Sequence, residues 1–552
     1  MTDRARLPIL LLLIAATAAV YAPSLGYGFV YDDARQIEMS RSRFTWSQAP
    51  GYFTSDVWSY AERKTGNYYR PGFLVWLLVN YKMFGLSRPL WHASAVALHV
   101  LTTLLLFFLA RRITGDDPVA GMTALLFGVH PVHVEAVAWV SGATEPLTAA
   151  LWLAALLGYL RGWRVLPVAL FGAALFSKET AITLPAVLFV YEWRASPDGL
   201  RAALRRLIPY LGVVAVYLGF RTYALRAFMP RSAHWPIFEL LLSLPETICF
   251  YLRQLLWPAR LGLFHEIQPV ANPSWRNFFL PWVLLMAGAA AMAVIWRASR
   301  AGAIALILLI VPLLPVLDLP AFGRDDFVHD RYLYLPAAGL CLLAAIGLLR
   351  ILTLRPAVAS ALAAAAILSV LTVRESRFWR NDDTLAAHAL DIAPHSVQAR
   401  QLYAVDLVLD ERYADALPLL ADPRALAVWD KPALLYTTGL CLYEMGHWEE
   451  AEARLREAIA LHPDYPQAHM LLGMAEARAG RLDQAEAEMR QAIQQRPRAS
   501  LQYSGYHAAL AGLLEQKGDF RGALAEYEIE LQEQPGEEAV ADRAQALRAR
   551  LR

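Results

Sequence analysis

The feature that most constrains this fold is a long succession of apolar segments between residues 7 and 373. The hydrocarbon core of a bilayer is about 30 Å thick, so a helix needs roughly 20 mostly apolar residues to cross it. The chain has 552 residues, of which 57% are hydrophobic and 18% are charged, a composition too apolar for a soluble protein. The pattern predicts about eleven membrane-spanning helices, at residues 7–25, 90–110, 118–130, 146–160, 165–177, 180–193, 207–224, 277–296, 302–317, 333–351 and 356–373.

Arginines at the ends of the spans indicate how these helices are oriented across the membrane. They all fall on one side of the membrane if the spans are right: Arg111, Arg112, Arg161, Arg164, Arg201, Arg205, Arg206, Arg297, Arg300, Arg350 and Arg355. Because basic residues stay on the cytoplasmic side, an odd number of spans places the N-terminus inside and everything after residue 373 outside. The preference for Arg over Lys suggests a bacterial genome. We therefore expect a multi-pass protein of a bacterial inner membrane, with its C-terminal part in the periplasm.

Two further apolar segments are not expected to cross. Residues 238–258 are interrupted by Pro245, Glu246 and Arg253, which favours an amphipathic or re-entrant helix at the outer face. Residues 70–85 are similarly expected to lie along the outer surface.

The C-terminal part has a repeat. Landmark residues recur 34 residues apart, which is the tetratricopeptide-repeat period: Gly439 and Gly473, Ala451 and Ala485, Ala458 and Ala492, Pro463 and Pro497. A third copy carries Ala511, Ala523, Tyr527 and Pro535, and residues 393–420 resemble a degenerate leading copy. The alternative is an unrelated helical bundle.

The chain is therefore predicted to be all-α, in three parts. A polytopic membrane domain occupies residues 1–373, a connector with a degenerate first repeat 374–431, and a soluble tetratricopeptide-repeat α-solenoid 432–552. Repeats of this kind bind peptides or partner proteins. The net charge of +2 indicates no attraction to nucleic acid.

The acidic pair Asp32-Asp33 follows the first span directly. Two carboxylates at a membrane surface are costly to desolvate and repel each other, so they favour a catalytic or cation-binding site. The alternative is a solvated loop that only ends the helix. A divalent cation at this pair is left open.

Other polar residues gather at the same predicted face. Lys178 and Arg331 are predicted on the outer side, although basic residues usually stay on the cytoplasmic side. Together with the two carboxylates, these two cations favour a site that binds phosphate. An interfacial side chain that only snorkels to the headgroups is the alternative for each. The pair His130 and His133 has zinc-ligand spacing, but no third ligand is placed by spacing, so no metal site is predicted there.

In order, these motifs resemble a known family. Tyr31-Asp-Asp, Tyr69-Arg-Pro, His130-Pro-Val-His-Val-Glu-Ala-Val, Lys178-Glu and Asp330-Arg-Tyr-Leu-Tyr-Leu-Pro, followed by the repeats, are similar to the transmembrane and tetratricopeptide-repeat-containing O-mannosyltransferases. They also resemble the bacterial relatives of these proteins in the type C glycosyltransferase superfamily. This chain departs from the relatives at Ala143-Thr-Glu145, where a basic-acidic pair is common.

The resemblance implies transfer of a sugar, such as mannose, from a polyprenyl-phosphate carrier to an acceptor hydroxyl on the outer face. It implies the type C membrane fold, and a base in the first loop: Asp33 ahead of Asp32. The chemistry agrees, because a lipid phosphate leaves without a proton and a single carboxylate base suffices, with inversion at the sugar carbon. The residues expected to line the carrier, sugar or acceptor site are Arg70, His130, His133, Glu135, Lys178, Glu179, Asp330 and Arg331. The repeats are expected to bind a protein or peptide acceptor that offers Ser or Thr.

Two other functions are open. The chain could be a membrane scaffold whose repeats recruit envelope proteins, although the outward cluster of ionisable residues exceeds what an anchor needs. It could also transport a lipid-linked substrate. A transporter should show internal repeats among its spans and charges near the membrane midplane, and the sequence shows neither clearly.

Overall fold

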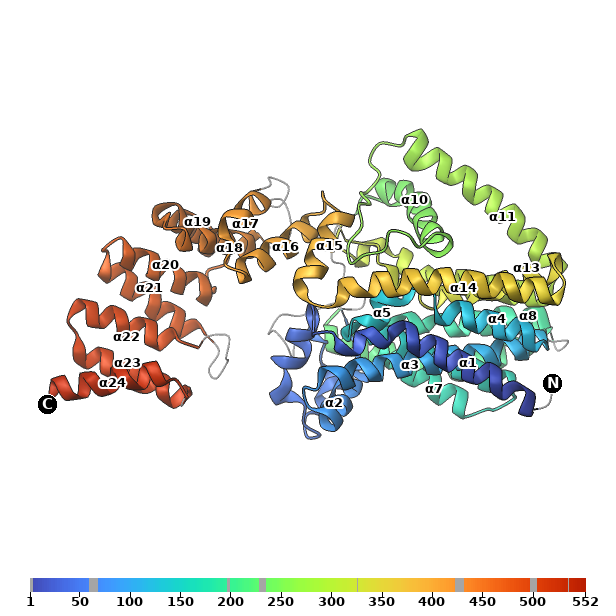
Figure 1. Cartoon of the computed structure of the whole chain (residues 1–552), viewed down its shortest axis with the longest axis horizontal. Coiled ribbons are helices and arrows are strands. Elements are labelled where there is room, and N and C mark those ends of the chain that lie inside the picture. Colours follow the sequence, from blue (N-terminus) through green and yellow to red (C-terminus); the bar gives the residue numbers. More distant parts are fainter. Residues whose placement is uncertain are drawn as a thin grey trace. The chain divides into compact units, whose positions relative to one another are not determined.

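The computed structural model describes residues 3–58, 68–195, 199–227, 235–324, 326–421, 431–496, 504–534 and 536–552. The chain forms two compact units, Met1–Pro394 and His395–Arg552. The described residues form helices joined by loops, and their only β-type pairing is an isolated bridge between Gly323 and Asp326. The all-α prediction is confirmed, and Figure 1 shows the helices in chain order.

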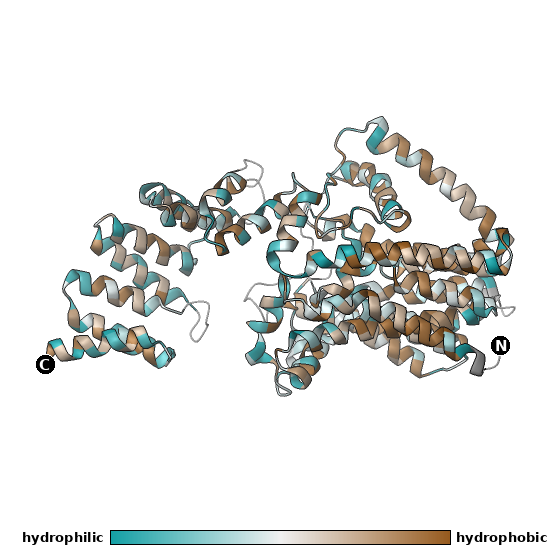
Figure 2. Cartoon of the chain, viewed as in Figure 1, coloured by the Kyte–Doolittle hydropathy of each residue, from teal (hydrophilic) through white to brown (hydrophobic). Residues whose placement is uncertain are grey.

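The first unit contains the apolar helices. Its α-helices are α1 (Asp3–Tyr21), α2 (Pro71–Phe84), α3 (Arg88–Thr114), α4 (Asp117–Gly128), α5 (Val134–Ala138), α6 (Thr144–Leu160), α7 (Leu166–Ser177), α8 (Leu184–Ala195), α9 (Gly199–Leu225), α10 (Ile237–Leu256), α11 (Leu280–Ala298), α12 (Arg300–Ile310), α13 (Pro336–Ile351), α14 (Leu354–Ser376) and α15 (Asp382–Ile392). Apolar residues run along most of their length in Figure 2. Hydrophobic side chains that face lipid remain exposed in the structure, as on α11.

Every predicted span is a helix, but the spans differ in length. Within the described residues, seven helical segments are long and apolar enough to cross a membrane: Arg6–Gly26, Arg88–Thr114, Ser141–Leu160, Ala203–Leu225, Trp275–Ala298, Arg300–Leu317 and Leu354–Trp379. The other predicted spans are the shorter helices α4, α7, α8 and α13. A 12-residue helix such as α4 rises only about 18 Å, so it cannot cross alone. The chain is a multi-pass membrane protein whose short helices need neighbouring segments to complete a crossing.

Hydrogen bonds between helix ends gather many of the arginines at one end of the helical unit. Asp117, at the start of α4, accepts bonds from Arg6 of α1 at 3.3 Å and from Arg111 of α3 at 2.6 Å. Arg112 donates to the carbonyl of Leu160, where α6 ends, at 2.8 Å. In the same way Arg194 reaches the end of α11, and Arg350 bonds to Ala298. The loops that hold the acidic pair join the opposite ends of these helices.

Helix α10 covers most of the segment that was not expected to cross. It is not among the described helices apolar enough to cross a membrane. Ile237, Phe238 and Leu241 are exposed, whereas Leu242 and Tyr251 are buried. This two-sided helix fits the predicted amphipathic segment. The other such segment is α2, which buries part of its surface against the unit.

The described part of the second unit is a series of helix pairs followed by a single last helix, α24: α16 (Val397–Leu409), α17 (Tyr413–Leu420), α18 (Lys431–Glu444), α19 (Trp448–Leu461), α20 (Pro466–Arg478), α21 (Leu482–Gln495), α22 (Tyr506–Lys517), α23 (Phe520–Glu533) and α24 (Glu538–Leu551). The expected degenerate copy corresponds to α16 and α17. The division between the units falls after Pro394, whereas the sequence pattern placed the end of the membrane domain at residue 373 and the start of the regular repeats at 432.

Small residues at the landmark positions allow paired helices to pack closely. A Cβ added to Gly473 of α20 would lie 2.7 Å from Met489 Cγ and 2.9 Å from the carbonyl oxygen of Ala485, both on α21. Gly439 meets Leu455 in the same way one repeat earlier. The landmark prolines Pro497 and Pro535 lie outside the described residues.

Candidate active site

The acidic pair lies in the loop between α1 and α2, at the start of a short π-helical turn, Ala34–Glu38. Asp33 is fully buried. Its Oδ1 accepts hydrogen bonds from the backbone N–H of Ser141 at 2.8 Å and from Ser141 Oγ at 2.5 Å, and its Oδ2 accepts one from the Val30 N–H at 3.2 Å. These bonds tie the first loop to the start of α6, 108 residues further along the chain.

Burial changes how Asp33 titrates. Desolvation raises the pKa of its carboxyl to about 7, although the bonds from Ser141 and Val30 oppose the rise, and the charge of Asp32 adds to it. Asp33 therefore changes its charge near neutral pH. Asp32 itself is only partly buried. Of the two acidic residues, Asp32 is the more exposed.

Three cations expected at this face each pair with a carboxylate. Arg70 forms a bidentate pair with Glu179, with Nε–Oε2 at 3.0 Å and Nη2–Oε1 at 2.6 Å. Lys178 Nζ bonds to Glu145 Oε1, and Arg331 Nη1 bonds to Glu135 Oε1. The backbone N–H of Arg331 also donates to Glu135, at 2.8 Å. All three pairs join segments that are far apart in sequence.

Two of the three pairs are more buried than surface salt bridges, whereas the side chains of Arg70 and Glu179 are 16% and 35% exposed. Lys178 is 1% exposed and Glu135 3%. Burial is the largest influence on Lys178 and lowers the pKa of its ammonium, although Glu145 opposes this. Burial alone would raise the pKa of Glu179, but Arg70 and Lys178 lower it to about 2. Glu179 is thus held as an anion beside two cations.

Aromatic rings bring these cations together. The ring of Tyr332 lies 4.9 Å from Lys178 Nζ and 5.1 Å from the guanidinium carbon of Arg331. Arg70 lies 4.5 Å above the ring of Tyr68, and Arg331 5.6 Å from the ring of Trp139. Cations stacked on aromatic faces retain free N–H donors for a further anion.

The acidic loop reaches the same aromatic group. The ring of Tyr31, immediately before Asp32, lies 5.8 Å from that of Trp139. The charge of Arg331 acts on both Tyr31 and Tyr68. The structure thus brings Asp32 and Asp33 into the neighbourhood of Arg70, Glu135, Lys178, Glu179 and Arg331.

The two histidines, His130 and His133, have different surroundings from the three cations. His130 Nε2 donates to the carbonyl of Leu255 at 3.1 Å, and its Nδ1 accepts from the Val132 N–H at 3.3 Å, so both ring nitrogens are engaged by backbone. His133 is fully buried, with Phe127 and Tyr334 at centroid distances of 4.3 and 4.6 Å. These contacts favour structural positions for both rings.

Asp330, immediately before Arg331, has other partners than the cations. Its carboxylate accepts bonds from the Gly262 N–H at 2.9 Å and from Gln254 Nε2 at 3.1 Å, and His265 Nε2 lies 3.1 Å away. Asp330 therefore holds the segment after α10 against the loop that carries Arg331.

Sequence reasoning missed three kinds of partner: Glu145, Ser141, and the rings of Tyr332 and Trp139. The signal for Glu145 is an acid at the start of one apolar span where Lys178 follows the end of the next, because consecutive antiparallel helices bring such positions together. No comparable signal identifies Ser141 or the two rings, since their contacts depend on the folding of distant loops.

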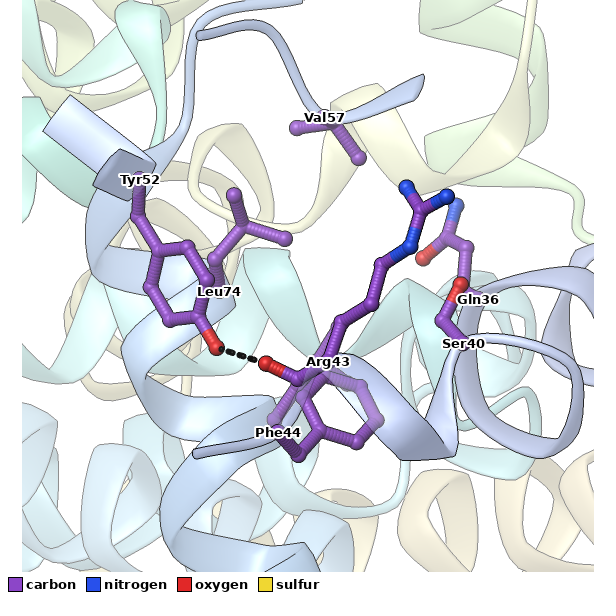
Figure 3. A pocket seen from close by; sticks show the side chains of 8 residues that line it. Gln36, Ser40, Arg43, Phe44, Tyr52, Val57 and Leu74 are labelled. Carbon is purple, nitrogen blue, oxygen red and sulfur yellow. Dashed lines mark hydrogen bonds between the residues drawn. The ribbon is translucent and has the colours of Figure 1, made fainter. Parts of the chain in front are cut away.

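Two pockets adjoin this region. One encloses about 300 Å³, open solvent included, between the first loop and α2, and is lined by Gln36, Ser40, Arg43, Phe44, Tyr52, Val57, Leu74 and Leu77. Figure 3 shows the Tyr52 hydroxyl donating to the Arg43 carbonyl, at 3.1 Å. The second, of about 160 Å³, is lined in part by Glu135, Asp330 and Glu375. None of Arg70, Lys178 and Arg331 lines either pocket, although Glu135 and Asp330 line the second.

The possible cation at the acidic pair gains no support. In the described part of the chain, neither Asp32 nor Asp33 belongs to a set of three or more His, Cys, Asp or Glu side chains close enough to share a metal ion.

Known proteins resemble both the repeats and most of the rest of this chain. The tetratricopeptide-repeat family model matches residues 436–500. Protein O-mannosyl-transferase TMTC1 of Homo sapiens is 26% identical over 465 residues, which cover 71% of this chain and 52% of that protein. Protein O-mannosyl-transferase F38B6.6 of Caenorhabditis elegans is 26% identical over 414 residues, covering 70% of this chain and 58% of that protein. The chain is thus similar to protein O-mannosyl-transferases over about 70% of its length.

The resemblance predicted from the motifs is thereby confirmed, and so are the tetratricopeptide repeats. The chain spans about half the length of these two relatives. Among solved structures, it is similar to ArnT from Cupriavidus metallidurans bound to undecaprenyl phosphate, with 18% identity and a TM-score of 0.35, over 94% of this chain and 79% of that one.

Proposed function

We propose that this chain is an integral membrane glycosyltransferase. It transfers a hexose, such as mannose, from a polyprenyl-phosphate carrier to a Ser or Thr hydroxyl of a protein or peptide. The names of the relatives support the reaction class. The observation that carries the proposal is the meeting of a buried acidic loop with three carboxylate-paired cations stacked on aromatic rings.

The reaction needs two kinds of group, and this site offers both. The acceptor oxygen forms a bond to the anomeric carbon of the sugar while the bond from that carbon to the carrier phosphate oxygen breaks. A carboxylate takes the hydroxyl proton, and cations stabilise the departing phosphate. A single displacement of this kind inverts the anomeric carbon.

The geometry favours Asp32 as the base, with Asp33 in support. A general base must come within hydrogen-bond distance of the acceptor hydroxyl. Both oxygens of Asp33 accept bonds from Ser141 and Val30, and the residue is fully buried. Asp32 is the more exposed residue of the pair. We therefore assign proton transfer to Asp32 and the shaping of the loop to Asp33, the reverse of the order expected from the sequence.

The cations have donors to spare for the carrier phosphate. Arg331 carries five side-chain N–H groups, and the carboxylate of Glu135 engages Nη1. Its planar guanidinium can grip a phosphate with two parallel hydrogen bonds. Lys178, 4.9 Å from the centre of the Tyr332 ring that Arg331 also contacts, adds a point charge. The paired carboxylates keep both cations charged and fixed in the absence of the carrier.

The orientation follows from the charge distribution. The arginine-rich end of the first unit belongs in the cytoplasm by the positive-inside rule. The acidic loop, the cations and the second unit then belong on the periplasmic side of a bacterial inner membrane. The tetratricopeptide repeats would capture the protein acceptor there.

The proposal is tested with the purified full chain in nanodiscs. Mannosyl-phosphoryl-polyprenol and a Ser/Thr-rich peptide are supplied, and free polyprenyl phosphate and the mass of the peptide are measured. We expect equimolar carrier phosphate and glycosylated peptide, with activity that survives a chelator. Activity lost in chelator and regained with a divalent cation would instead place a metal at the acidic pair. Intact carrier that crosses the bilayer would indicate a transporter, and unchanged carrier in every fraction would leave only a scaffold.

A further inference from the structure

The residues just before the acidic pair are held by a segment some 350 positions further along the chain. The Gly28 N–H donates to the carbonyl of Arg380 at 2.9 Å, and the Tyr31 N–H donates to Asp382 Oδ1 at 2.7 Å. The Tyr27 hydroxyl lies 3.3 Å from Ser376 Oγ. The end of α14 and the start of α15 thus fasten the loop from Tyr27 to Tyr31.

Tyr31 has an unusual backbone. Its φ is 54°, in the left-handed region that residues other than glycine rarely adopt. Such a conformation persists only where the surrounding structure holds it in place, and it is concentrated at functional sites. Here the backbone N–H of the strained residue itself is bonded to Asp382, and its ring packs against Trp139 and Phe264.

Asp382 does not serve its own helix in this contact. The N-cap of α15 is Asn381, whose side chain accepts from the Thr384 N–H at 3.2 Å. The neighbouring Asp383 is exposed, and its side chain accepts a hydrogen bond from Asn381 Nδ2 at 3.3 Å. Of these three residues, Asp382 is the one whose side chain reaches the first loop.

We propose that Asp382 is a positioning residue for the transfer reaction: by bonding to the Tyr31 N–H it holds the left-handed turn that directs Asp32 and Asp33. This inference rests on the proposed function. Asp32 follows Tyr31 immediately, so a change in the Tyr31 backbone redirects the carboxylate. Misplacement of a catalytic group by about 1 Å can lower the rate roughly a hundredfold.

The matched variants are Asp382→Ala, Asp382→Asn and Asp383→Ala. Asp382→Ala removes the acceptor, whereas Asp382→Asn keeps a carbonyl oxygen at the same place. Asp383→Ala removes the same charge from the same helical turn without touching the loop, and serves as the control.

Two readouts separate the inference from the proposed function. The first, hydrogen exchange of residues 27–34 in the full chain in nanodiscs, needs no activity. We expect Asp382→Ala to exchange roughly tenfold faster there, since a bond to a charged acceptor is lost, while Asp382→Asn and Asp383→Ala stay near the wild type. Unchanged exchange in Asp382→Ala would overturn the inference even if the wild type proved to have no transferase activity.

The second readout is transfer kinetics. Asp382→Ala should lower kcat by about ten- to a hundredfold with the donor KM within about twofold, and Asp382→Asn should recover most of the rate. Equal kcat in all four proteins would overturn the positioning role. If Asp382→Ala does not fold, Asp382→Ser replaces it, because serine suits the start of a helix but is too short to reach Tyr31. The same outcomes then decide.

Discussion

Charged residues are used differently in the two units. In the first, Lys178 and Glu145 form a pair whose side chains are 2% and 9% exposed. In the repeats, Arg548 and Glu528 form a pair whose side chains are 52% and 42% exposed. A buried pair loses much of its attraction to desolvation, and replacement by apolar residues is often neutral or stabilising, whereas an exposed pair adds little either way. Stability alone would not select the buried pairs, which agrees with the role in phosphate binding proposed for them.

The units also differ in how their helices approach. The repeats obtain close packing from small residues at fixed intervals, such as Gly473 against α21. The site instead fills its space with aromatic rings that contact cations, such as Tyr332. A regular spacing can be recognised in a sequence, whereas the contact of the Tyr332 ring with the distant Lys178 cannot.

The largest effect that sharpens this comparison is expected at Arg331. Arg331→Ala leaves Glu135 buried and uncompensated, which should lower the free energy of unfolding by about 3–5 kcal/mol and transfer by at least a hundredfold. The double variant Arg331→Gln/Glu135→Gln should regain most of the stability and none of the activity. Thermal unfolding and transfer assays measure the two separately. Activity regained together with stability would show that the pair is only structural.

The next effect is a pH dependence at Asp33. Its raised pKa means that the folded protein keeps a proton there that the unfolded chain has lost, between the ordinary 3.8 and about 7. Stability should therefore fall as pH rises through this window, by at most about 4 kcal/mol. Asp33→Asn cannot ionise and should lose this part of the dependence. Parallel unfolding curves of the wild type and the variant from pH 4 to 8 would contradict the buried position of Asp33.

A smaller effect is expected in the repeats. Gly473→Ala forces a methyl group against Met489 and the Ala485 carbonyl, which should lower stability by about 1–3 kcal/mol. The control is Gly512→Ala in α22, where nothing lies within 4 Å of the added carbon, and helix propensity should raise stability slightly. Release of polyprenyl phosphate without a protein acceptor should be unaffected in both. Equal melting temperatures for the two variants would contradict the close packing at Gly473.

The smallest effect concerns an exposed pair. Arg548→Ala removes the bonds from Arg548 Nε and Nη2 to Glu528 at 3.1 and 2.8 Å, yet stability should change by less than about 1 kcal/mol. A loss of stability comparable with that of Arg331→Ala would show that the exposed and the buried pairs do not differ in this way.

Much of the fold followed from the sequence, because spans and repeats are local patterns. The 34-residue recurrence of Gly439 and Gly473 identified the repeats, and the arginines marked one end of the first unit. The sequence did not predict which carboxylate each cation pairs with, since Arg331 and Glu135 are 196 residues apart. Nor did the order of exposure within the acidic pair, which depends on Ser141, 108 residues from Asp33. The bond from His130 to the Leu255 carbonyl joins residues 125 positions apart, so the spacing of residues in the sequence could not predict it.

The proposed function gives proton transfer to Asp32, the more exposed residue of the acidic pair, and carrier binding to the paired cations. The most direct test is turnover of mannosyl-phosphoryl-polyprenol by the full chain, comparing the wild type with Asp32→Asn at equal donor occupancy. We predict a loss of about two to four orders of magnitude in kcat, with the donor Kd unchanged and a smaller loss in Asp33→Asn. Turnover by Asp32→Asn close to that of the wild type would contradict the account.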